Sequence, residues 1–364
     1  ELSSQHDRYR RQSPLKNGDR INVSTKTTTS STPIVIVNIL YSRKKWKKPF
    51  CFKINQTHYQ KLRDRFMEIH ANTTTMTTSS SSLFGGNNNN ISNNNMGLLV
   101  ERSFHVLILA LLLRYSALSG GQLLEDLRGG GMQGGIHSSV FDVLQSYFSN
   151  NSSSSPPKSS SKEFWLEGFA SPFNATLPRF ASVFPDVDWH FGSVGRFLEC
   201  NFDGDDEEEF CEANPPFTPG IMLTMANHMT QVLEKADNDN TRLTFAVIVP
   251  SADNKKKKNK DEAVVKHEAL TSFRNLESSV YCTTHIKLKS REHGYVEGAQ
   301  HLRPTQYKES SYDTSVIVLQ SLKARKYGLD EKKMKQFEKD LRLAFASRHK
   351  NELTERKRKA ELVK

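Results

Sequence analysis

The sequence is poor in cysteine, and the placement of its cysteines excludes several kinds of site. Only Cys51, Cys200, Cys211 and Cys282 occur among 364 residues. No two of them form a Cys-x-x-Cys pair, and no histidine stands at metal-ligand spacing from them. We therefore expect reduced thiols in an intracellular protein and no metal site.

Long apolar runs are also missing. The longest spans residues 106–113 and ends at Arg114. A helix that crosses a bilayer needs about 20 apolar residues, so this run predicts a buried helix and not a membrane anchor. No signal peptide is visible, and because the chain begins at Glu1 and not at Met, we expect further residues upstream.

What the chain has in excess is positive charge. Its formal net charge is +11, and its hydrophobic fraction of 36% is diluted by tracts of Ser, Thr and Asn. Such a charge favours an anionic partner, nucleic acid first and a membrane surface second, although it also serves solubility alone. The length allows one large domain with appendages or two domains.

The first half of the chain predicts a mainly helical domain with a small β element. Residues 1–32 are polar and lack periodicity, so we expect disorder there, and we expect an unstructured low-complexity insert at 71–95. The domain would span residues 33–150, with a linker at 151–162. Its predicted elements are strands at 33–40 and 50–54 and helices at 57–69, 97–116 and 139–148.

The second half alternates strands and helices, which predicts an α/β domain over residues 163–322 and a basic helical tail over 323–364. Its predicted strands lie at 164–170, 210–213, 243–249, 285–288 and 314–320, and its predicted helices at 177–184 and after Pro219. Thr218 and Pro219 are typical N-cap and first-turn residues. In such folds a ligand sits at the carboxyl ends of the strands.

One turn combines groups that suit methylation of an exocyclic amine. The Asn214 side-chain oxygen and the Pro215 carbonyl can accept hydrogen bonds from an NH2 group and aim its lone pair at a methyl donor. Pro215 and Pro216 stiffen the turn, and Phe217 can stack on a base. The same four residues also suit a rigid strand-to-helix turn without chemistry, so the turn alone leaves both interpretations open.

Two basic segments are candidates for contact with RNA. Residues 43–48 interrupt a run of Lys and Arg with Trp46, which offers phosphate contact together with a stacking face. A solvated loop explains the same residues. Residues 355–359 are nearly all basic and are typical of a nuclear import signal or an RNA contact, so we expect a nuclear protein.

Five segments in order resemble the catalytic region of the phosphorylated-CTD-interacting factor family, whose members are cap-specific adenosine N6-methyltransferases. The segments are Gly-Phe-Ala-Ser-Pro-Phe-Asn at 168–174, Phe-Pro-Asp-Val-Asp at 184–188, Phe-Gly-Ser-Val-Gly at 191–195, Glu-Ala-Asn-Pro-Pro-Phe at 212–217 and Gly-Ala-Gln-His at 298–301. The resemblance runs from about residue 139 to residue 320, and more faintly through Arg114 and Gln133.

The resemblance implies a Rossmann-type methyltransferase domain that uses S-adenosylmethionine, preceded by a helical domain that helps to hold capped mRNA. The catalytic residues it implies are Asn214, Pro215, Pro216 and Phe217. The cofactor-binding residues would be Gln133, Phe169, Ala170, Ser171, Pro172, Asn174, Asp186, Asp188, Phe191, Gly192, Ser193 and Gly195. Substrate contacts would come from Trp46, Arg114, Gln300 and His301.

The chain departs from the family pattern in its tryptophans. Trp46, Trp165 and Trp189 lack the spacing of a WW domain, which puts binding of the RNA polymerase II tail in doubt. The most specific function that follows is transfer of a methyl group to N6 of the cap-adjacent (2′-O-methyl)adenosine of mRNA. The alternatives are N6-adenine methylation of DNA or of internal RNA positions, and a catalytically silent RNA-binding member.

Overall fold

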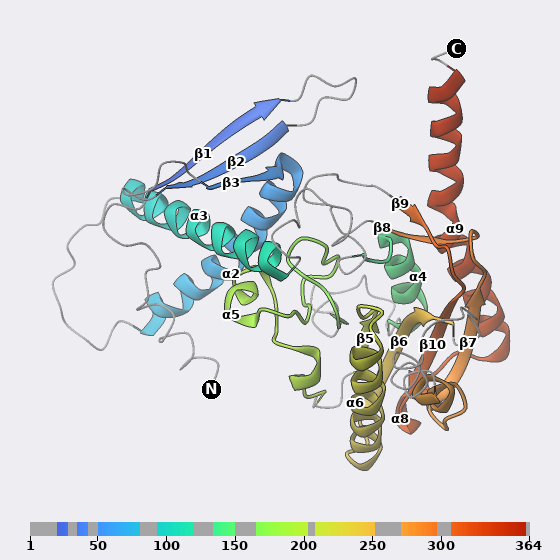
Figure 1. Ribbon diagram of the computed structural model, residues 1–364. Coiled ribbons are helices and arrows are strands. Elements are labelled where there is room, and N and C mark those ends of the chain that lie inside the picture. The colour runs from blue at the N-terminus through green and yellow to red at the C-terminus, as the bar shows by residue number, and fades with distance from the viewer. Residues whose placement is uncertain are drawn as a thin grey trace. The chain divides into compact units, whose positions relative to one another are not determined.

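The structure, a computed structural model, divides the chain into two compact units. Residues 20–27, 35–42, 50–80, 93–118, 134–149, 165–202, 208–251, 271–296 and 307–361 are described. The first unit comprises Glu1–Arg128 with His301–Pro304, and the second comprises Gly129–Gln300 with Thr305–Lys364. Figure 1 labels the elements of both units.

The first unit contains a three-stranded antiparallel sheet and two long helices. The strands β1 (Arg20–Thr27), β2 (Val35–Ser42) and β3 (Phe50–Asn55) lie in the order β1-β2-β3. The helices α2 (Gln56–Ser80) and α3 (Asn93–Leu118) follow. Fully buried apolar side chains from sheet and helices form the core of this unit, namely Ile39, Ile54, Leu62, Phe104, Ile108 and Leu112.

This unit is more ordered than the sequence predicted. Residues 20–27 form a strand within the stretch 1–32 for which we expected disorder, because they pair with β2 along their whole length and Ile21 and Val23 alternate with polar residues. The helices α2 and α3 also enter the low-complexity insert from both sides, at 71–80 and 93–95. Extending an existing helix costs far less than nucleating a new one.

The second unit is built on a five-stranded mixed sheet. Its strands are β4 (Trp165–Glu167), β5 (Glu208–Ala213), β6 (Arg242–Pro250), β7 (Cys282–Leu288) and β10 (Thr314–Gln320), in the order β4-β5-β6-β10-β7. β4, β5 and β6 are parallel, whereas β10 is antiparallel to both of its neighbours. The expected α/β class is therefore confirmed in its coarse form, and the sheet is mixed, since β6 pairs in parallel with β5 and antiparallel with β10.

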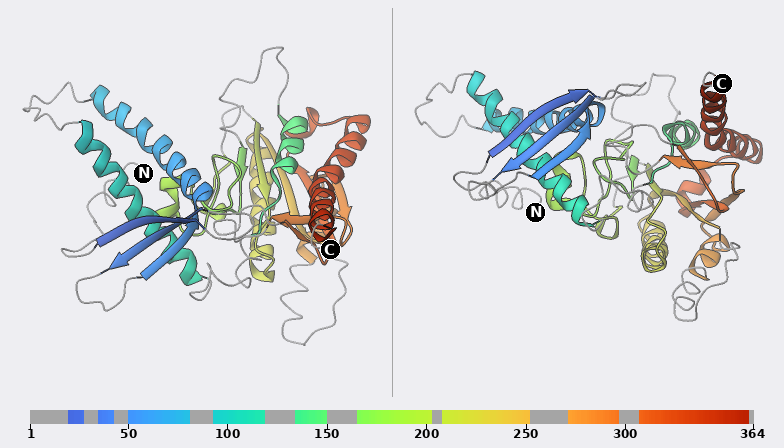
Figure 2. Two further views of the ribbon diagram at one scale, coloured as in Figure 1. Left: turned by 90° about the horizontal axis from the view of Figure 1, so that it is seen from above. Right: turned by 45° about the horizontal axis from the view of Figure 1, so that its top comes forward.

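Helices cover both faces of this sheet, as Figure 2 shows from two sides. On one face, α6 (Pro219–Asn238) buries Met222, Met225 and Met229 against a cluster of apolar sheet residues. On the other face, α4 (Ser138–Phe148) and α9 (Glu331–Glu361) bury Phe141 and Phe337 among others. Apolar residues at helical spacing thus form the two layers that cover the sheet.

The chain between β4 and β5 differs from the expected strand–turn–helix unit. β4 is only three residues long, and residues 177–184 form turns and bends and not a helix. Their backbone instead extends the sheet: Ala181 N–H donates to the Glu167 carbonyl at 2.8 Å, and Ala170 N–H donates to the Ala181 carbonyl at 3.0 Å. These hydrogen bonds satisfy groups that a helix would have used internally.

Several short elements complete the second unit. They are α5 (Pro185–Asp188), the 3-10 helices η4 (Trp189–Phe191) and η5 (Phe197–Glu199), the hairpin of β8 (Gly294–Val296) and β9 (Tyr307–Glu309), and α8 (Leu322–Lys326).

The predicted domain boundary also differs from the observed one. The helix α4 was expected in the N-terminal domain, but it packs in the second unit, where Tyr147 Oη donates a 2.6 Å hydrogen bond to Asp340 of α9. The predicted linker 151–162 lies outside the described residues. No helix in the described part of the chain combines the length and the hydrophobicity needed to cross a membrane.

Candidate functional site

The Asn-Pro-Pro-Phe turn lies directly between β5 and α6. The strand ends at Ala213, and α6 begins at Pro219 with Thr218 as its N-cap, as predicted. Asn214 is only 8% exposed, and its Oδ1 atom has no hydrogen-bond partner in the described structure. A buried amide oxygen without a partner is costly for the folded protein, which makes it a candidate for binding a ligand donor.

The position of the turn follows from the parallel register of the sheet. Glu167 of β4 stands opposite Glu212 of β5, and Ala213 stands opposite Val247 of β6, so the turn emerges at the carboxyl edge. Gly168, which follows β4, donates its N–H to the Glu212 carbonyl at 2.7 Å. A Cβ atom at Gly168 would lie 2.9 Å from the Phe197 ring, so only glycine fits this close approach.

The two segments predicted to face the cofactor are joined by backbone hydrogen bonds. Residues 179–182 run between them: Ala170 N–H donates to the Ala181 carbonyl at 3.0 Å, and Ser182 N–H donates to the Gly195 carbonyl at 2.8 Å. A further bridge pairs Phe180 with Ser193. The loops 168–174 and 191–195, distant in sequence, therefore belong to one irregular extension of the sheet beyond β4.

Most predicted cofactor residues in these loops are buried. Ser171, Pro172, Asn174, Asp188, Phe191 and Ser193 are buried, whereas Phe169, Ala170, Asp186, Gly192 and Gly195 are partly exposed. Asn174 Oδ1 accepts from Ser171 N–H at 2.7 Å and from Ser171 Oγ at 2.8 Å. Ser193 Oγ lies 2.7 Å from Ser182 Oγ. Much of this polar content thus fixes the loops themselves.

Two carboxyl groups stand side by side at the ends of β4 and β5. Glu167 is 4% exposed and Glu212 is 1% exposed. Glu167 Oε2 accepts the backbone N–H groups of Thr176 at 2.7 Å and Leu177 at 3.0 Å. Burial and the neighbouring Glu167 raise the pKa of Glu212 well above its usual range.

Aromatic side chains surround Phe217. Its ring centroid lies 6.0 Å from that of Tyr295 and 5.8 Å from that of Tyr312, both in edge-to-face geometry. Tyr295 Oη is hydrogen-bonded to Thr314 Oγ1 at 2.8 Å, and Thr314 Oγ1 lies 2.7 Å from His293 Nε2. Burial raises the pKa of Tyr312 to about 12, so its phenol stays protonated at neutral pH.

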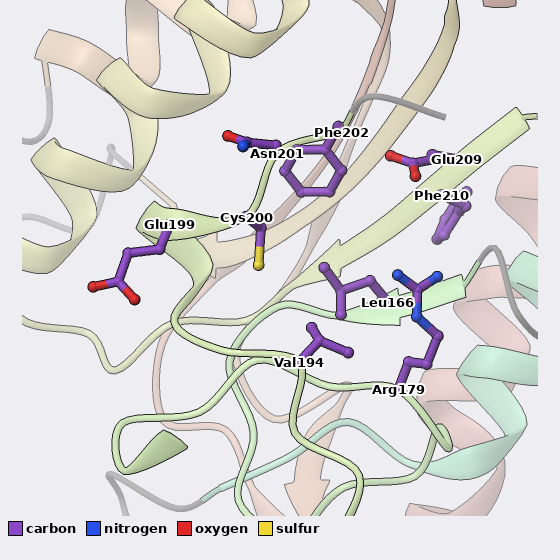
Figure 3. A pocket seen from close by; sticks show the side chains of 9 residues that line it. All are labelled: Leu166, Arg179, Val194, Glu199, Cys200, Asn201, Phe202, Glu209 and Phe210. Carbon is purple, nitrogen blue, oxygen red and sulfur yellow. The ribbon is translucent and has the colours of Figure 1, made fainter. Parts of the chain in front are cut away.

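A cavity of about 180 Å³ lies elsewhere in the second unit. Figure 3 shows the side chains that line it, including Leu166, Arg179, Cys200, Glu209 and Phe210. Glu209 and Phe210 belong to the amino-terminal half of β5, whereas Asn214 follows the carboxyl end of that strand. The cavity is therefore separate from the Asn-Pro-Pro-Phe turn.

The predicted substrate residues stay predictions, because none of them lies in the described part of the second unit. Arg114 is exposed on α3, in the first unit. Trp46, Gln133, Gln300 and His301 lie outside the described residues. Within the described ranges, no group of three or more His, Cys, Asp or Glu side chains could hold a metal ion, and all four cysteines are free thiols.

Sequence reasoning assigned no role to Glu167, Glu212, Tyr295 or Tyr312. Glu167 carried a usable signal, because a carboxylate at the end of an otherwise apolar strand is rarely buried unless it has a partner or a function, whereas Glu212 follows two other glutamates in its strand. The two tyrosines carried none, since they reach Phe217 only through the pairing of distant segments. Together the site offers acceptors for an amine, a flat aromatic surface and a buried carboxyl pair.

Comparisons with known proteins agree with the resemblance described above. A family model described as the phosphorylated CTD interacting factor 1 WW domain matches residues 82–298, more than half of the chain. Two relatives, from Homo sapiens and Mus musculus, are named mRNA (2'-O-methyladenosine-N(6)-)-methyltransferase. Each is 28% identical over 214 residues, which cover 58% of this chain and 25% of the relative. The matched part of the chain thus spans about a quarter of the length of these relatives.

Proposed function

The chain belongs to the phosphorylated CTD interacting factor 1 family, and from this premise we propose that it transfers a methyl group to N6 of the cap-adjacent adenosine of mRNA. The names of the two relatives support this reaction and substrate. The single observation that carries the proposal is Asn214 Oδ1, a buried acceptor without a partner in the described structure, at the carboxyl edge of the sheet.

The proposed catalysis is alignment of the amine and stabilisation of its developing positive charge. Asn214 Oδ1 and the Pro215 carbonyl would accept hydrogen bonds from the N6 amino group as that charge grows, an interaction that strengthens toward the transition state. Phe217 would hold the base by stacking, and Tyr295 and Tyr312 contact the Phe217 ring in edge-to-face geometry. No protein base is required, because the proton can leave to water after transfer.

We propose S-adenosylmethionine as the methyl donor and a Rossmann-type arrangement for its domain. When bound, this cofactor supplies an electrophilic methyl group on a sulfonium. The strands β4, β5 and β6 are parallel, and their carboxyl edge is where doubly wound folds bind ligands. The residues fit such a ligand: Asp188 is a fully buried acid, and a Cβ built on Gly195 meets nothing within 4 Å, so this backbone borders open space.

The residues proposed for the cofactor are those predicted from the sequence. The backbone of 168–174 and of 191–195 would approach it closely, and Asp186 or Asp188 would accept from its ribose hydroxyls or its ammonium group. Capped mRNA is the proposed partner, with Arg114 an exposed candidate contact and the net charge of +11 favouring a polyanion. We propose a nuclear location, which the basic segment 355–359 favours.

We do not extend the proposal to the RNA polymerase II tail. Trp165 lies in the parallel strand β4 and Trp189 in the 3-10 helix η4, so neither has the antiparallel setting of a WW domain, and Trp46 lies outside the described residues.

Labelled S-adenosylmethionine separates the proposed reaction from its alternatives. The protein should methylate RNA that begins with a cap and 2′-O-methyladenosine, and should leave uncapped RNA and DNA unlabelled. Equal labelling of uncapped RNA or of DNA would favour a broader N6-adenine methyltransferase. RNA binding without any labelling would favour a silent RNA-binding member.

Asn214→Ala should abolish methylation while it leaves cofactor binding largely intact. The substitution removes the side-chain acceptor and leaves the loops 168–174 and 191–195 in place. Initial rates and calorimetric titration with S-adenosylhomocysteine measure the two quantities. Asn227→Ala, on the exposed side of α6, is the matched control and should resemble the unmodified protein in both. A loss of cofactor affinity as large as the loss of rate would contradict this role.

A further inference from the structure

The carboxyl pair Glu167 and Glu212 is the feature of the site that the proposed function leaves unexplained. The two residues are cross-strand partners, and both are almost completely buried. A buried ionised pair of like charge is strongly disfavoured, so one of the two must be neutral or must find a counter-charge. Their different surroundings decide which one is neutral.

Glu167 is held as the charged member of the pair. Its Oε2 atom accepts two backbone N–H groups, from Thr176 and Leu177, and such donors stabilise a carboxylate. Glu212 lacks this support, because its Oε1 atom is buried and has no hydrogen-bond partner in the described structure. Glu212 therefore keeps its proton at pH values at which an exposed glutamate has lost it, and a protonated carboxyl is a hydrogen-bond donor.

Glu212 faces the same place as the proposed catalytic turn. Glu212 lies on the same face of β5 as Phe210, since residues two apart along a strand point to the same side, and Asn214 follows two residues later at the strand end. Ala246, which stands opposite Glu212 on β6, belongs with Phe210 and Tyr295 to one buried cluster, and Phe217 packs against that cluster. The same Tyr295 ring contacts Phe217. The ionisable groups on this side of the sheet include Glu167, opposite Glu212 on β4, Tyr295 on β8, and Tyr312, whose ring centroid lies 6.4 Å from that of Tyr295.

Two buried polar atoms without partners thus lie two residues apart: an acceptor on Asn214 and a donor on Glu212. The edge of adenine around N6 presents the complementary pattern, because its amino group donates and the ring nitrogens beside it, N1 and N7, accept. Resting on the proposed function, we propose that Glu212 is a specificity-determining residue whose carboxyl donates a hydrogen bond to a ring nitrogen beside N6 of the target adenine.

This assignment explains how the site would reject guanine. Guanine carries a carbonyl oxygen where adenine carries the amino group, and its N1 is a donor. Asn214 Oδ1 would then face an acceptor, and Glu212 would face a donor if it reads N1. Buried polar groups left unpaired in this way give strong discrimination between otherwise similar ligands.

The test combines two variants of Glu212 with two substrate analogues. Glu212→Gln keeps a neutral donor and acceptor of similar shape, whereas Glu212→Leu keeps the volume and removes both. The substrates are capped RNAs whose first nucleotide is adenosine, 1-deazaadenosine or 7-deazaadenosine. Each analogue replaces one ring nitrogen with a C–H group and leaves the N6 amine in place. The measured quantity is kcat/KM for methyl transfer.

We expect one of the two analogues to lower kcat/KM of the unmodified protein by roughly 10- to 100-fold, as loss of one buried hydrogen bond does. Glu212→Leu should lower kcat/KM on adenosine by a similar factor. The Leu variant should then show about the same kcat/KM on adenosine and on that analogue. Glu212→Gln should stay within about tenfold of the unmodified protein on adenosine. The analogue that matters identifies N1 or N7 as the acceptor.

Thermal unfolding is the control that shows whether each variant is folded. Replacing a buried polar group that lacks a partner with an apolar one of similar volume should leave the midpoint unchanged or raise it. Glu212→Met provides a second apolar variant if Glu212→Leu lowers the midpoint. Undiminished methylation by both apolar variants would overturn the assignment, as would equal sensitivity of all forms to both analogues or a Gln variant as inactive as the Leu variant. If the unmodified protein methylates no adenosine, the proposed function fails, and this assignment fails with it.

Discussion

Two glycines in the loop after α5 share a backbone conformation but differ in their surroundings. Gly192 has φ of 107° and Gly195 has φ of 129°, values that L-residues with a side chain rarely adopt. A Cβ on Gly192 would lie 2.5 Å from the Pro178 carbonyl oxygen, whereas a Cβ on Gly195 would meet nothing within 4 Å. Gly192 therefore has a steric reason to be glycine in addition to the conformational one.

Alanine substitutions at these two positions should distinguish the cost of backbone strain from the cost of a steric clash. We expect Gly195→Ala to lower the free energy of unfolding by about 1–3 kcal/mol through backbone strain. Gly192→Ala should cost more, because the added methyl group meets backbone that is hydrogen-bonded on both sides. Urea unfolding followed by tryptophan fluorescence measures both, since Trp165 and Trp189 lie in this unit. Equal losses for the two variants would mean that the contact with Pro178 relaxes freely.

At the scale of elements, the contact between α4 and α9 holds one face of the sheet together. Phe141 and Leu144 of α4 and Phe337 and Leu341 of α9 belong to one buried cluster. At its margin, Tyr147 donates its hydrogen bond to Asp340. Burial, followed by this bond to Asp340, raises the pKa of Tyr147 to about 12.

This shift predicts a loss of stability in alkali. A group whose pKa is higher in the folded state stabilises that state fully below its unfolded pKa, which is about 10 for tyrosine. The contribution is lost as the pH rises from about 10 through 12. The difference in free energy of unfolding between the Tyr147→Phe variant and the unmodified protein should therefore become smaller from pH 9 to pH 12. Urea unfolding at each pH measures this difference. A constant difference would show that Tyr147 titrates normally.

The sequence predicted well those elements whose signals are local. The boundaries of α4, α6 and β10 follow from apolar spacing, from the Thr218-Pro219 start signal and from a short apolar run. The prediction of a helix at residues 177–184 was wrong. The backbone of this segment forms hydrogen bonds with the backbone of Glu167 and Ala170, and no local sequence pattern reveals such pairing. The same reason applies to the site. Asn214 and Phe217 stand in one motif, whereas Tyr295 and Tyr312 meet Phe217 only after the sheet has formed.

At the scale of the whole molecule, the position of α4 defines where the second unit begins. A fragment that starts at residue 134 keeps α4, whereas one that starts at residue 165 removes the cover from Phe337 and Leu341, both fully buried in the intact chain. We expect the first fragment to unfold cooperatively on heating and the second to lose its near-ultraviolet circular dichroism or to aggregate. The same unfolding midpoint for both fragments would mean that α4 contributes little to the unit.

The antiparallel strand β10 has a consequence for how the protein is made. β10 lies between β6 and β7 in the sheet but follows both in the chain. Until the ribosome has released residue 320, β6 has a free edge along residues 243–249, which are all apolar or β-branched and all buried in the finished protein. Such an edge invites pairing with other chains. The interval between synthesis of β6 and arrival of β10 is thus when a nascent chain most needs protection, and a ribosome that stalls there leaves the most aggregation-prone fragment.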